Sequence, residues 1–121
     1  MTQLLAHLVG DYVLQSQPMA DRKVSSLPWA VVHAAFYTLP FLFLTSSPAA
    51  LLVIGGTHAL IDRYRVAARW CAFYGSGSVS GLWGRFSVRD EPPPPFLTVW
   101  LTIIVDNTFH LCINHFALVA R

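Results

Sequence analysis

An apolar stretch that carries a histidine and an aspartate constrains this chain most. It runs from Ala49 to Ala68 and holds no charged residue before Asp62, which follows His58 by four positions. Residues at i and i+4 of a helix lie on the same face, so the imidazole and the carboxylate point to one place. A charged group is costly in apolar surroundings and needs a partner. The pair is therefore a candidate functional site.

The same spacing occurs at two other places. His7 precedes Asp11, and Asp106 precedes His110, each in an apolar segment. Three of the six acidic residues are thus paired with three of the five histidines, and His33 lies in a further apolar segment. This repetition predicts that several helices contribute to one polar cluster.

Composition predicts a membrane protein. Hydrophobic residues make up 55% of the 121 residues and charged residues 12%, whereas a soluble domain carries about 25% charge. The net charge of +2 is too small to indicate nucleic acid as a partner. The lipid bilayer is therefore the expected partner.

Four apolar segments predict an all-α fold, an integral membrane helical bundle in a single domain over residues 1–121. The first segment is short for a span of roughly 30 Å, so we expect it to be tilted or re-entrant. Gly55 and Gly56 are expected to let another helix approach closely. The predicted segments are residues 1–15, 27–44, 49–68 and 96–119, joined by a polar connection at 16–26, a turn at 45–48 and a flexible Gly/Ser/Pro loop at about 71–95. Within that loop, residues 82–89 alternate aromatic and basic side chains and are expected on the membrane surface.

The basic residues predict an orientation. With four spans, seven of the eight Lys and Arg residues fall on one side, which is the cytoplasmic side by the positive-inside rule. The expected location is a bacterial inner membrane, crossed several times. The row Arg63, Arg65 and Arg69 is expected to anchor a helix end to lipid headgroups, with a phosphate-bearing substrate as the alternative.

Imidazoles and carboxylates that converge from several helices are suited to a divalent metal such as zinc. His58 and Asp62 are the predicted catalytic pair, since a bound metal can activate water. Two alternatives remain open at this point: a proton relay of a transporter or channel, and a structural network that only holds helices together. The candidate metal ligands are His7, Asp11, His33, His58, Asp62, Asp106 and His110.

Two resemblances follow from these motifs. The order Leu-Leu-Ala-His-Leu-Val-Gly-Asp-Tyr-Val-Leu-Gln at 4–15, then His33, His58-Ala-Leu-Ile-Asp62 and Asp106-Asn-Thr-Phe-His110 resembles a family of small bacterial and phage multi-pass membrane proteins known only as a domain of unknown function. Residues 56–62 are also similar to the His-x-x-x-Asp helix of bacterial inner-membrane metal-dependent hydrolases. The chain lacks the His-Arg pair and the Thr-His-Ser of that hydrolase motif.

The leading hypothesis is a membrane-embedded, metal-dependent hydrolase acting on a phosphate-bearing or lipid substrate. The alternatives are a proton- or ion-coupled transporter and a non-enzymatic structural or interaction protein of phage or prophage origin. The sequence names no substrate and leaves the oligomeric state open, a homo-oligomer included.

Overall fold

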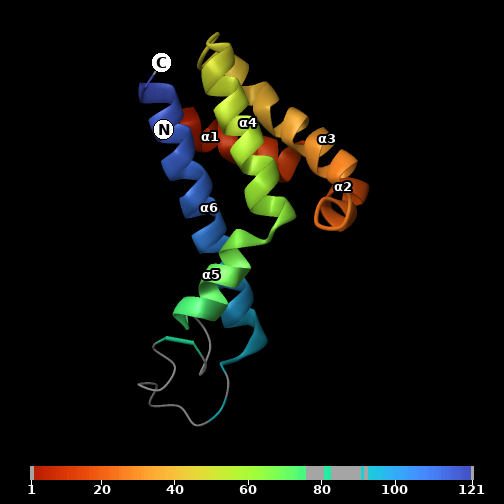
Figure 1. Ribbon diagram of the computed structural model, residues 1–121, viewed down its shortest axis with the longest axis vertical. Coiled ribbons are helices and arrows are strands. Elements are labelled where there is room, and N and C mark those ends of the chain that lie inside the picture. The colour runs from red at the N-terminus through yellow and green to blue at the C-terminus, as the bar shows by residue number, and fades with distance from the viewer. Residues whose placement is uncertain (1, 76–80, 83–90, 92, 121) are drawn as a thin grey trace. The chain divides into compact units, whose positions relative to one another are not determined.

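The computed structural model describes residues 2–75, 81–82, 91 and 93–120, and in this part of the chain the regular elements are all helices (Figure 1). The all-α prediction is confirmed. The chain forms two compact units, of which the first comprises Met1–Tyr64 and His110–Arg121 and the second Arg65–Phe109. The predicted surface segment lies outside the described residues from position 83 to position 89.

The first segment consists of α1 (Thr2–Leu8) and a π-helical turn, η1 (Val9–Val13). The wider turn ends with the Leu14 N–H donating to the Val9 carbonyl, five residues back, at 2.9 Å. A β-carbon added to Gly10 would lie 2.6 Å from the Tyr37 carbonyl oxygen. Glycine therefore lets η1 approach the next long helix closely.

The predicted polar connection at 16–26 contains a helix, α2 (Gln17–Arg22). Pro18 lies in the first turn of α2, where its missing N–H and fixed φ are compatible with a helix. Lys23 follows as the C-cap residue of α2.

The second segment agrees with the prediction of residues 27–44. It is made of α3 (Leu27–Thr38) and a 3₁₀ turn, η2 (Leu39–Phe43). Pro40 lies at the start of η2 and has no N–H to donate to the preceding turn, which accounts for the end of regular α-helix here.

The third segment is shorter than the predicted 49–68. It is α4 (Pro48–Arg63). Its N-cap residue is Ser47, whose hydroxyl accepts a hydrogen bond from the Ala50 N–H. Arg65 then adopts a left-handed conformation with φ of 50°, and α5 (Val66–Tyr74) follows. The change of backbone conformation ends the helix, which the continuous apolar pattern did not reveal. Residues 71–74, predicted as loop, belong to α5.

The fourth segment, α6 (Pro95–Val119), matches the predicted 96–119. Of the described helices it is the one long and apolar enough to cross a membrane by length and composition, while Leu27–Phe43 is apolar but shorter. Residues up to Phe109 belong to the second unit, and those from His110 onward belong to the first.

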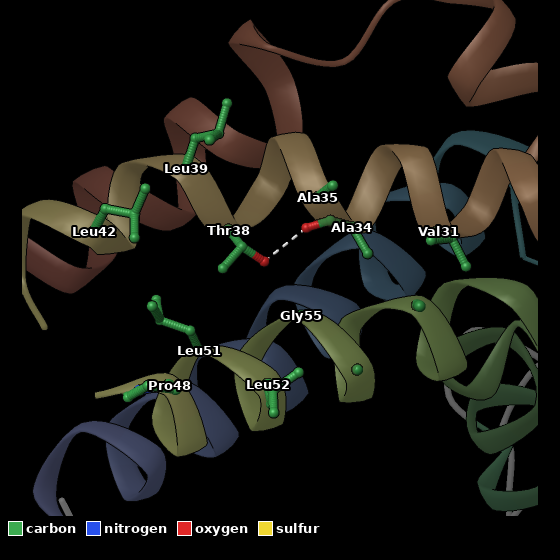
Figure 2. A pocket seen from close by; sticks show the side chains of 12 residues that line it. Val31, Ala34, Ala35, Thr38, Leu39, Leu42, Pro48, Leu51, Leu52 and Gly55 are labelled. Atoms are coloured by element: carbon green, nitrogen blue, oxygen red, sulfur yellow. Dashed lines mark hydrogen bonds between the residues drawn. The ribbon is translucent and has the colours of Figure 1, made fainter. Parts of the chain in front are cut away.

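In the first unit, α3 and α4 lie side by side (Figure 1). Gly55 meets α3 there, because a β-carbon at Gly55 would lie 2.6 Å from the Thr38 hydroxyl oxygen. Figure 2 shows that hydroxyl between the helices, where it donates to the Ala34 carbonyl at 2.7 Å. The prediction for Gly56 was wrong, since a β-carbon there would meet nothing within 4 Å. Gly56 instead borders an open apolar groove of about 550 Å³ between the two helices.

Candidate metal centre

Four polar side chains converge inside the first unit. They are Asp11 of η1, His33 of α3, and His58 and Asp62 of α4, and all four are buried. Each offers one ligand atom, and the four atoms lie within 4.8 Å of one another. The convergence predicted from the sequence is present for these residues.

The local structure explains why these side chains meet. His58 and Asp62 are one turn apart on α4, as their spacing predicted. His7 and Asp11 of the first segment face His33 and Tyr37 of α3. His7 contacts Tyr37 and Asp11 contacts His33, so each residue of one i,i+4 pair meets a residue of the other. His7 and Asp11 therefore share a face, but each contacts a partner on α3.

The distances between the ligand atoms are short and similar. Nε2 of His33 lies 3.0 Å from Nε2 of His58, 3.2 Å from Oδ1 of Asp11 and 3.3 Å from Oδ2 of Asp62. Nε2 of His58 lies 3.4 Å from Oδ2 of Asp62 and 3.7 Å from Oδ1 of Asp11. A tetrahedral zinc site with bonds of about 2.0–2.2 Å has ligand–ligand edges of about 3.3–3.6 Å. Five of the six distances among the four ligand atoms are therefore 3.0–3.7 Å, close to the edges of such a tetrahedron.

His110 lies behind two of these groups. Its Nδ1 is 3.3 Å from Nδ1 of His58, and its Nε2 is 3.4 Å from Oδ1 of Asp62. The atoms of these two ligands that face the centre are Nε2 of His58 and Oδ2 of Asp62, and His110 contacts neither of them in these two interactions. Such contacts orient metal ligands, because they fix the tautomer of an imidazole and the rotation of a carboxylate.

Tyr37 forms a further polar layer, and sequence reasoning did not assign it to the site. Its hydroxyl accepts a hydrogen bond from Asn114 Nδ2 at 2.6 Å and lies 2.9 Å from His7 Nδ1. Asn114 is buried as well. The candidate ligand His7 is therefore bonded to Tyr37, in the layer behind the four converging groups. The signal that could have indicated Tyr37 is its position four residues after His33 in an apolar helix.

Lys23 is the second residue that the sequence did not indicate as part of the site. Its Nζ lies 2.6 Å from Oδ2 of Asp62 and 3.9 Å from Oδ1 of Asp11. In the sequence it looked like one of several basic residues in a polar connection. The long flexible side chain brings its charge to a place that its position along the chain does not reveal.

Asp106, the remaining candidate ligand, lies on α6 one turn before His110 and is half-buried. It belongs to the second unit. The four converging residues all belong to the first unit, so Asp106 is not among them.

The donor set fits a divalent metal ion. Two imidazole nitrogens and two carboxylate oxygens are ligands for zinc and for related ions of borderline hardness. Nδ1 of His33 is buried without a hydrogen-bond partner among the described residues, while Nε2 of the same ring lies 3.2 Å from Oδ1 of Asp11. The structure therefore contains a buried His/Asp cluster able to hold a metal ion.

A protein family with the description "Protein of unknown function (DUF3307)" matches residues 1–85. The chain belongs to this family. The matched part of this DUF3307 member includes Asp11, Lys23, His33, His58 and Asp62, whereas His110 lies beyond it. No curated protein and no solved structure matches the chain.

Proposed function

We propose that this protein is a multi-pass membrane protein with a divalent-metal centre of the hydrolytic kind, and that zinc is the preferred ion. The observation that supports the proposal is the spacing of Asp11, His33, His58 and Asp62, since five of the six distances among their ligand atoms are close to the edges of a zinc tetrahedron. A network of ion pairs that only holds helices together does not require four possible ligand atoms to approach one common point.

One triangle of ligand atoms suggests roles within the centre. His33, His58 and Asp62 lie 3.0–3.4 Å from one another, a His₂-carboxylate set. Catalytic zinc sites use three protein ligands of this kind and leave a fourth position for water or substrate. An ion held there supplies Lewis acidity and an activated water. Asp11 lies at the fourth corner, 3.7 Å from His58, where its carboxylate can hold a proton or complete the coordination.

The distribution of side chains in the first unit supports membrane residence. Its interior holds ionisable and polar groups, while large hydrophobic side chains such as Phe36, Phe43, Leu52 and Phe116 are exposed. Exposed apolar surface of this extent is unfavourable in water and favourable in lipid. At about 1.5 Å per residue, the 16 residues of α4 extend about 24 Å, so we propose that it spans most of the hydrocarbon layer beside α3.

Metal analysis of purified, detergent-solubilised protein tests the proposal. We expect about one zinc per chain in the wild type and loss of affinity by an order of magnitude or more in Asp62→Asn, which retains shape but removes the anionic ligand. Asp21→Asn is the matched control, since Asp21 bonds to Gln17 on the exposed side of α2. Wild-type protein that binds no stoichiometric metal would refute the centre and leave a structural His/Asp network.

A row of imidazoles favours a proton relay as the second candidate function. His110, His58 and His33 follow one another through nitrogen–nitrogen distances of 3.3 and 3.0 Å. Each such contact needs one protonated and one unprotonated nitrogen, so a proton can pass along the row. Reconstituted protein that moves protons without bound metal would favour this function over hydrolysis.

A further inference from the structure

Lys23 is the most exposed of the charged groups that contact the centre. About 17% of its side chain is accessible, compared with 7% and 5% for the side chains of Asp11 and Asp62 and none for that of His33. The Lys23 side chain therefore runs between the buried centre and accessible surface.

The Lys23 ammonium faces three of the four ligand atoms. Its Nζ is 2.6 Å from Oδ2 of Asp62, 3.4 Å from Nε2 of His33 and 3.9 Å from Oδ1 of Asp11. A cation above that face of a tetrahedron lies within about 4 Å of its centre. At such a distance two positive charges repel strongly, because the surroundings are only partly hydrated.

We propose that Lys23 is a resident counter-cation that a divalent metal must displace, so that this side chain sets the metal affinity of the centre. The inference rests on the proposed metal centre. In the absence of metal the Lys23 ammonium balances part of the charge of the buried Asp11 and Asp62 carboxylates. With metal bound, the positive charge of the ion repels the same ammonium from the ligand atoms. A divalent ion replaces it because it brings twice the charge to the same carboxylates.

The ammonium already has one partner outside the ligand set. Nζ donates to Oε1 of Gln15 at 2.7 Å, a bond that is independent of the two carboxylates. The accessible part of the side chain also allows it to turn toward solvent. Movement of the ammonium therefore needs no change in the helices that carry the ligands.

Zinc titration of variants tests this role. Removing the competing charge in Lys23→Met, or in the polar variant Lys23→Gln, should tighten zinc binding about tenfold or more. Arg22→Met is the matched control, because Arg22 lies over the Trp29 ring and its loss should leave zinc affinity within about twofold. Equal or weaker zinc binding by both Lys23 variants, with the wild type binding zinc, would overturn the inference while leaving the metal centre intact.

The wild-type protein provides a second test that needs no variant. Lys23 is the only lysine of the sequence, so an amine-modifying reagent followed by mass spectrometry reports on this single side chain. Zinc should increase its labelling rate several-fold as the ammonium leaves the carboxylates. Unchanged or reduced labelling with zinc bound would show that the ammonium is not displaced. If no variant and no wild-type sample binds zinc, the inference and the proposed centre fail together.

Discussion

The Tyr37 ring lies flat against the imidazole of His58, with ring centroids 3.6 Å apart and planes inclined by 6°. The stacking holds a ligand imidazole in place from its face, while His110 contacts its Nδ1 at the edge. Together with the hydroxyl bonds to His7 and Asn114, this makes Tyr37 the link between the candidate metal centre and the polar layer behind it.

Tyr37→Phe should separate the two roles of this side chain. The phenyl ring keeps the stacking on His58, but Asn114 loses an acceptor and His7 loses a partner. We expect the free energy of unfolding to fall by about 1–2 kcal/mol with zinc affinity nearly unchanged, as measured by denaturation and metal titration in detergent. Tyr64→Phe is the control, because Tyr64 is exposed. A large loss of zinc affinity in Tyr37→Phe would show that the hydroxyl itself positions the ligands.

Gly10→Ala should disturb the centre through the backbone. The new β-carbon would lie 2.6 Å from the Tyr37 carbonyl oxygen and 3.0 Å from its Cα, neither of which can rotate away. The π-helical turn would have to move away from α3, at a cost of about 1–3 kcal/mol. Since Asp11 lies on that turn, both thermal stability and zinc affinity should fall. Unaltered zinc binding would mean that Asp11 is not a ligand.

Gly55 and Gly56 should respond oppositely to alanine. At Gly55 the β-carbon would displace the Thr38 hydroxyl from its bond to Ala34, whereas at Gly56 there is open space. Gly56→Ala should be neutral or stabilise by about 0.5–1 kcal/mol through helix propensity. Gly55→Ala should be less stable than Gly56→Ala by about 1–3 kcal/mol. Adding Thr38→Ala should relieve part of that loss, and additive effects in this double-mutant cycle would contradict the predicted contact.

Chelation should lower stability only where the centre is intact. A ligand that binds the folded state at 100 times its Kd stabilises it by about 2.7 kcal/mol. Thermal unfolding of the wild type should therefore occur at lower temperature after chelation and recover with added zinc. Asp62→Asn should show little response to either treatment, and an equal response in both proteins would indicate that zinc binds elsewhere.

The sequence by itself determined the helical class and most of the candidate ligands. Apolar segments separated by the polar connection at 16–26, the turn at 45–48 and the loop at about 71–95 leave few alternatives to helices, and the i,i+4 spacing placed His58 and Asp62 on one face of α4. The same periodicity placed His7 and Asp11 together on the face that meets α3. These are local properties, which depend on the helical period and on the cost of leaving polar groups unpartnered in apolar surroundings.

Only the tertiary structure decided which of the seven candidate ligands share one point. Asp11, His33, His58 and Asp62 meet because η1, α3 and α4 pack closely, with Gly10 and Gly55 allowing the approach. His7 and His110 lie in the layers behind them, where His7 is hydrogen-bonded to Tyr37 and His110 contacts Asp62. Lys23 enters the centre from a segment that the sequence showed only as polar and basic. The reason is that helical periodicity fixes the face on which a residue lies, whereas the reach of a long side chain and the register between helices depend on packing between distant segments.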